Sequence, residues 1–179
     1  LGQPGVAADM LADLPADRLR RSEALRAADL YFALDRNAEA EALYDRVIGM
    51  DGADRQWRPL LARAVVRAET GRWPEAEADL LKAREISPDQ PDVLNFLGYG
   101  WVDRGVRVEE GLRLIEQALR IRPDAGHIVD SLGWAHYRLG DYATAVRHLE
   151  RAAQLAPSDP VVLDHLGDAY ARLGRKREA

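Results

Sequence analysis

A period of 34 to 35 residues constrains this chain more than any other feature. Leu-Gly pairs begin at Leu97, Leu132 and Leu166, which are 35 and 34 residues apart. Two further series of residues keep the same spacing. The first consists of the glycines Gly71, Gly105, Gly140 and Gly174, and the second of the prolines Pro88, Pro123 and Pro157. Three kinds of residue in one phase indicate a copied unit, and such units stack so that each buries the apolar surface of its neighbour.

Within one period the apolar and small residues follow helical spacing in two segments. They are Val129, Leu132 and His136 in the first segment, and Ala145, Leu149 and Ala152 in the second. Gly140 is predicted to end the first helix in a left-handed conformation, and Gly133 to let the paired helices approach closely. Pro157 should stop the second helix, and Asp159 and Pro160 should cap and begin the next one. The sequence therefore predicts an all-α fold of helix-turn-helix units.

The stretch LGWAHYRLGDYATAVRHLERAAQLAP, residues 132–157, resembles the tetratricopeptide repeat. The resemblance extends over residues 21–179 and implies a right-handed superhelical solenoid. We assign repeats to residues 21–54, 57–90, 91–125 and 126–159, with a partial repeat at 160–179. Residues 1–20 are interpreted as an N-terminal segment that contains a short helix, VAADMLADL, and is the remnant of a preceding repeat.

Three repeats depart from the pattern. The first has Asp35 where glycine is expected, and the second has Arg63 and Ala64 in place of the Leu-Gly pair. The third carries one extra residue in GVRVEEGL, residues 105–112, which predicts a bulged turn. Trp101 stands at a core position of its helix, so we expect a structural role for it.

Composition excludes several classes of function. The 25 Lys and Arg against 30 Asp and Glu give a net charge of −5, so the chain lacks the basic surface that neutralises nucleic-acid phosphates. It has no cysteine, which removes disulfides, thiolate zinc sites and cysteine nucleophiles. Its uncharged apolar runs are too short to span a bilayer, so direct membrane insertion is not expected.

The beginning of the chain and its last repeats bear on its origin. The chain starts at Leu1 without Met or a signal-like segment, which we interpret as a fragment or a processed form. The last three repeats resemble the C-terminal region of long bacterial tetratricopeptide proteins, many of them exported. This resemblance favours a periplasmic or exported bacterial protein, and the residues themselves leave the cytoplasm open.

The resemblance implies that the first helix of each repeat lines a concave groove. Nine residues at groove positions are candidates for contact with a partner: Asn95, Tyr99, Asp103, Asp130, Trp134, Tyr137, Arg138, Asp168 and Arg172. The large rings of Tyr99, Trp134 and Tyr137 are the strongest of these signals, because such side chains dominate binding hot spots. The alternative is that these rings only pack against neighbouring first helices, as solenoids also require.

Groove charge indicates the kind of partner. With Asp92 and Asp164, the candidate aspartates give the groove an acidic character that suits a polar or basic extended peptide. The alternative is an ordinary solvated surface of an acidic protein. The family's carboxylate clamp needs Lys and Asn where this chain has Asp130 and Asp164, so partners held by their C-terminal carboxylate are not expected.

Two groups of residues bear on catalysis and metal binding. His127, Asp130 and Ser131 are the residue types of a hydrolase triad, but consecutive residues point about 100° apart on a helix and no oxyanion donor accompanies them. Asp164 and Asp168 share a helix face beside His165, with no third ligand implied. No enzyme activity, metal or cofactor is expected. His136 occupies a core position, and His148 is expected to be exposed.

The end of the array motivates an alternative to groove binding. Leu163, Leu166 and Tyr170 lack the second helix that would cover them, which predicts a homodimer through this end or a longer native protein. The expected function is a non-catalytic protein–protein interaction scaffold that binds a peptide or protein segment in the groove. The alternative is a self-assembly module that acts through its repeat ends.

Overall fold

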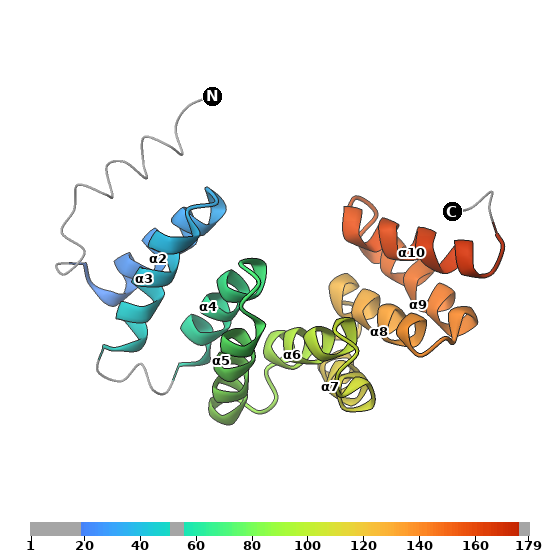
Figure 1. The fold of residues 1–179 in the computed structure, drawn as a ribbon, viewed down its shortest axis with the longest axis horizontal. Helices are drawn as coiled ribbons and strands as arrows, with labels where there is room; N and C mark the ends of the chain where they lie inside the picture. The colour runs from blue at the N-terminus through green and yellow to red at the C-terminus, as the bar shows by residue number, and fades with distance from the viewer. Residues whose placement is uncertain (1–18, 51–55, 176–179) are drawn as a thin grey trace. The chain divides into compact units, whose positions relative to one another are not determined.

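The computed structural model describes residues 19–50 and 56–175, and every regular element in these ranges is an α-helix (Figure 1). The chain divides into two compact units, Leu1–Pro88 and Asp89–Ala179. No helix in the described ranges is long and apolar enough to cross a membrane. The predicted N-terminal helix, VAADMLADL, lies outside the described residues.

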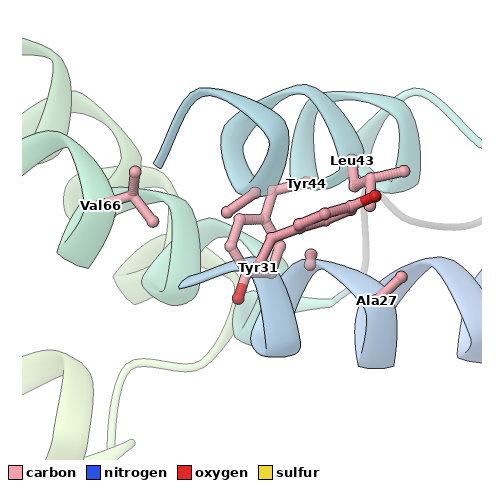
Figure 2. Close-up of a cluster of buried hydrophobic side chains, with 7 residues drawn as sticks. Ala27, Tyr31, Leu43, Tyr44 and Val66 are labelled. Carbon is pink, nitrogen blue, oxygen red and sulfur yellow. The ribbon is translucent and has the colours of Figure 1, made fainter. Parts of the chain in front are cut away.

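The described part of unit 1 contains two helix hairpins. Its helices are α2 (Arg21–Ala33), α3 (Asn37–Ile48), α4 (Trp57–Glu69) and α5 (Trp73–Ile86). Helix α2 packs on α3 and α4 packs on α5. Tyr31 and Tyr44 form the centre of an apolar cluster that α4 joins through Val66 (Figure 2). The Tyr44 hydroxyl also donates a hydrogen bond of 2.6 Å to Asp29 Oδ1, so a buried polar atom has its partner.

Up to residue 175, unit 2 contains two further hairpins and one more first helix. Its helices are α6 (Pro91–Asp103), α7 (Val108–Ile121), α8 (Gly126–Arg138), α9 (Tyr142–Leu155) and α10 (Pro160–Arg172). Helix α7 packs on α6 and α9 packs on α8, while α8 contacts both α6 and α10. We call the surface formed by α6, α8 and α10 the first-helix face. The predicted all-α helix-turn-helix architecture is confirmed.

The turns between paired helices use the left-handed conformation that the glycine spacing predicts. Gly71, Gly105, Gly140 and Gly174 all have positive φ, between 68° and 83°. Asp35 takes the glycine position of the first turn with φ of 57°, a conformation that a short polar side chain tolerates. The extra residue of the third repeat is accommodated by Arg107, which has φ of 48° directly before α7.

Close helix approach depends on the predicted glycines. An added Cβ on Gly98 would lie 2.6 Å from the carbonyl oxygen of Gly111, and one on Gly133 would lie 2.6 Å from Leu149 Cγ. Both distances are too short for real carbon contacts, so α7 can approach α6, and α9 can approach α8, only where no side chain is present. Trp101 is 1% exposed, as its core position predicts.

An ion-pair network in unit 1 is built on Arg63, which stands where later repeats have the leucine of the Leu-Gly pair. The Arg63 guanidinium donates to both carboxylate oxygens of Asp79, at 2.8 and 2.5 Å, and also to Asp45 at 2.6 Å. Arg67 adds a third contact to Asp79, at 2.9 Å. Asp79 is 5% exposed, so its charge is compensated almost entirely by these two arginines. The network ties α4 to α5 and to α3.

Two predictions about exposure are wrong. Tyr170 is only 9% exposed, because it packs on α9 and its hydroxyl donates to Glu150 at 2.8 Å. His148 is partly buried, because its ring stacks on that of His136 with centroids 5.5 Å apart. Leu166 is also partly buried, because it packs on the cluster around Leu149, whereas Leu163 is 48% exposed.

Candidate functional site

Three aromatic side chains form a continuous stack on the first-helix face. The indole of Trp134 lies between Tyr137, one turn further along α8, and His165 of α10. The centroid of the indole is 4.7 Å from that of Tyr137 and 4.1 Å from that of His165, with interplanar angles of 8° and 15°. We call His165, Trp134 and Tyr137 the ring stack. The His165 ring also lies 6.4 Å from the Tyr99 ring of α6, so side chains of all three first helices meet here.

Polar contacts join the ring stack to α6. Trp134 Nε1 donates a hydrogen bond of 3.2 Å to Asp103 Oδ1. Arg138 donates to the backbone carbonyl of Asp103 and lies 3.6 Å from its carboxylate. Because Asp103 is the last residue of α6, these contacts fix the end of that helix against α8.

A buried histidine–aspartate pair joins the ring stack to α10. His165 Nδ1 lies 3.0 Å from both carboxylate oxygens of Asp130. The two residues are 8% and 5% exposed, so the pair is shielded from solvent. Sequence reasoning placed Asp130 in the groove and missed His165. The signal that could have found it is their separation of 35 residues, one repeat, which places them on neighbouring first helices.

The other charged groups lie around the ring stack. Arg172 Nε donates to the Tyr137 hydroxyl at 3.2 Å, and its guanidinium lies 5.5 Å from the Tyr142 ring centroid. Burial, followed by the carboxylates of Asp103 and Asp130, raises the pKa of Tyr99 to about 12. The Tyr99 hydroxyl therefore keeps its proton at neutral pH and can donate a hydrogen bond.

The nine predicted contact residues differ in their exposure. Arg138, Asp168 and Arg172 are exposed, whereas Tyr99, Asp103, Trp134 and Tyr137 are partly buried. Asn95 and Asp130 are buried, at 9% and 5% exposure. The buried Asn95 Oδ1 has no hydrogen-bond partner among the described residues. Trp134 and Tyr137 thus pack within and between first helices, and each residue as a whole is only partly buried.

The structure does not bring His127, Asp130 and Ser131 together as a catalytic triad. Ser131 Oγ donates to the backbone carbonyl of His127 at 2.9 Å, a contact within its own helix. Asp130 bonds to His165 instead of to either of them. Within residues 19–50 and 56–175, no three His, Asp or Glu side chains are placed to hold a metal ion.

Solved structures share this fold over most of the chain. The Cut9–Hcn1 hetero-tetramer of APC/C matches with a TM-score of 0.82 at 16% identity, covering 99% of this chain and 34% of that one. PilF of Pseudomonas aeruginosa matches with a TM-score of 0.74 at 18% identity, covering 88% and 71% of the two chains. TTC0263, a tetratricopeptide protein of Thermus thermophilus, gives 0.78 at 20% identity, covering 89% and 86%.

Sequence comparisons identify the family. Family models described as tetratricopeptide repeat match residues 25–91 and 130–159. The TPR repeat-containing protein PA4667 of Pseudomonas aeruginosa is 32% identical over 138 residues, which are 74% of this chain and 23% of that protein. Together with the helix hairpins and their glycine turns, these matches show that the chain belongs to the tetratricopeptide repeat family.

Proposed function

We propose that this chain is a non-catalytic scaffold that binds a peptide or protein segment on the first-helix face of unit 2. Tetratricopeptide repeats serve generally as protein–protein interaction scaffolds. The observation that carries the proposal is the ring stack, which presents partly accessible aromatic surface held by contacts to α6 and α10. Side chains that are already ordered lose little entropy on binding, so a preorganised aromatic surface favours association.

The charges beside the ring stack support a polar segment as the partner. Asp168 and Arg172 are exposed on α10, and Arg138 is exposed at the end of α8. Charges of both signs around an aromatic centre resemble the polar rim of a protein interface, which sets selectivity and association rate more than affinity. A lone segment should bind with a dissociation constant of about 1 μM.

The test is selection of peptides from a random-peptide phage library on the whole chain, followed by affinity measurements on the selected peptides. Replacing Tyr99 and Asp168 with Ala should weaken binding by about 10-fold or more. Arg113 and Gln154 are exposed on the second helices α7 and α9, and their replacement with Ala is the matched control. Equal affinity for all variants would place binding elsewhere.

Self-assembly through the end of the array is the second candidate. Leu163 on α10 is 48% exposed, whereas Val129 and Leu94, which hold the same position in α8 and α6, are fully buried. An apolar residue exposed at a position that is otherwise buried favours contact with another surface. Light scattering of the wild-type chain and of Leu163→Glu tests this: a dimer that the substitution dissociates supports self-assembly, and a monomer in both rejects it.

A further inference from the structure

Rings stack on the Trp134 indole from two sides, which leaves the ring edge for contact with a partner. His165 covers one face of the indole and Tyr137 covers the other, both with nearly parallel planes. The indole N–H is also taken, because it donates to Asp103. Trp134 as a whole is only partly buried, and the stacking contacts leave the remaining edge as the part of the ring that a partner can reach. A cation or ring of a partner cannot stack on either face unless the ring stack first opens.

His165 is the residue that fixes this orientation from outside α8. Its Nδ1 is held by the buried Asp130 carboxylate, so the imidazole plane is set by a contact independent of Trp134. The matching positions of α6 and α8 are Phe96 and Ser131, and Ser131 bonds to its own helix. At this repeat position, among the three described first helices of unit 2, α10 alone supplies a ring that a carboxylate of the preceding first helix anchors.

We propose that His165 is a positioning residue: held by Asp130, it fixes Trp134 so that a bound segment meets the indole edge with an aromatic side chain. The edge of an aromatic ring carries partial positive charge and prefers the electron-rich face of another ring, whereas a cation is repelled there. The inference deepens the proposed function and rests on it for the identity of the site. It assigns the contact at Trp134 to an aromatic group of the partner, not to a lysine or arginine.

Two double variants separate the ring of His165 from its hydrogen bond. Asp130→Asn with His165→Phe keeps an aromatic ring against Trp134, while Asp130→Asn with His165→Gln keeps a polar group without a ring. Both carry the same neutral residue at position 130, so neither leaves a buried carboxylate unpaired. Circular dichroism checks helicity, and His165→Leu replaces His165→Gln if the latter pair fails to fold.

The first readout is the ¹⁹F spectrum of chains labelled with 5-fluorotryptophan. The chain has four tryptophans, and Trp134→Phe assigns the signal of Trp134 by its loss. We expect the Trp134 signal to stay closer to its wild-type shift in the Phe variant, which keeps a ring but loses the carboxylate anchor, than in the Gln variant, which loses both. A stabilising role alone would not distinguish the two, so an unchanged Trp134 signal in the ringless variant overturns the positioning role.

The second readout is the affinity of library-selected peptides for the whole chain. Replacing the aromatic residue of a selected peptide with Leu should weaken binding by about 10-fold to the wild-type chain and to the Phe variant, and by much less to the Gln variant. Equal losses in all three chains, or selected peptides that depend on Lys or Arg instead, would overturn the aromatic contact. If no peptide binds the wild-type chain, the proposed function fails while the ¹⁹F readout still decides the positioning role.

Discussion

At the scale of single residues, two histidines pack against each other in the hairpin of α8 and α9, and this packing affects the protonation of His148. The rings of His136 and His148 stack with an interplanar angle of 14°, where the preceding hairpin has Trp101 and Leu114 at the matching positions. Burial, and then the charge of His136, lowers the pKa of His148 below its ordinary value of 6.5. The folded chain therefore favours a neutral His148 more strongly than the unfolded chain does.

This pKa shift predicts a loss of stability in mild acid. The unfolded chain takes up the proton near pH 6.5 while the folded chain still resists it, so the free energy of unfolding falls as the pH drops from about 7.5 towards 5. His148→Leu introduces the residue that the preceding hairpin has at this position, and it should flatten that part of the pH profile of stability. Urea unfolding at a series of pH values measures it, with the exposed His127→Gln as control. An unchanged pH profile in His148→Leu would contradict the prediction.

Glycine at the helix crossings should be less replaceable in α6 than in α8. A methyl group on Gly98 meets a backbone oxygen of Gly111, whereas on Gly133 it meets chiefly the Leu149 side chain, which can turn away. Gly98→Ala should lower the free energy of unfolding by about 1 to 3 kcal/mol, and Gly133→Ala by less. Urea unfolding of both variants ranks them, and the reverse order would mean that α7 shifts more easily than Leu149 changes rotamer.

The roles of residues that backbone geometry requires were predictable from the sequence, whereas roles that depend on a contact with another helix were not. Gly140 and Trp101 follow from repeat position alone, because the turn needs positive φ and the helix pair needs a core side chain. His165 was missed because its role depends on Asp130 and Trp134 of another helix. The burial of Asp130 follows from the same contact, so its charge could not be assigned to the groove surface from sequence alone.

At the scale of the elements, an ion pair joins α4 and α5 at positions where the next hairpin, α6 and α7, has apolar residues. The matching positions of Arg63 and Asp79 are Leu97 and Leu114 in the next hairpin, and those leucines are 0% and 4% exposed. A buried ion pair is often no more stabilising than apolar residues of similar volume. Replacing one residue of the pair alone, however, leaves the charge of the other residue without its partner.

Either single replacement at this pair should therefore destabilise the chain more than the double replacement does. Arg63→Leu alone leaves Asp79 with only Arg67, and Asp79→Leu alone leaves Arg63 with Asp45, so each should lower the free energy of unfolding, by up to roughly 3 to 5 kcal/mol. The double change to Leu should recover most of that loss or exceed the wild type. Urea unfolding of the four chains forms the thermodynamic cycle. Additive losses would show that the two side chains do not act as a pair.

The helices themselves were predictable because the period places them, and at α10 the predicted cap agrees with it. All the described helices fall within the repeat ranges assigned from sequence, and Asp159 caps α10 by accepting from the backbone N–H of Val161 and Val162. The exposure of Tyr170 was not predictable, since it depends on Glu150 and on how closely α9 approaches α10. Repeat position predicts which helices pair, whereas side-chain volumes decide how deeply each residue is covered.

At the scale of the whole molecule, each unit has its own apolar core. Tyr31, Tyr44 and Val66 belong to one cluster in unit 1, while the clusters of unit 2 centre on Leu149 and Val129. In a repeat array each element contacts mainly its sequence neighbours, so stability is close to a sum of local terms. A destabilising substitution in one unit should then increase local opening in that unit alone. If the chain opened only by one global unfolding transition, the same substitution would affect all helices.

Hydrogen exchange measured by mass spectrometry tests this locality with a reciprocal pair of variants. Gly98→Ala should raise amide exchange in α6 and α7 and leave α2 and α3 unchanged, because its clash with Gly111 lies within unit 2. Arg63→Ala should raise exchange in α4 and α5 and leave α8 and α9 unchanged, because Asp79 and Asp45 lie within unit 1. If either substitution raises exchange equally in all described helices, the chain opens as one cooperative body, and binding on the first-helix face would then stabilise unit 1 as strongly as unit 2.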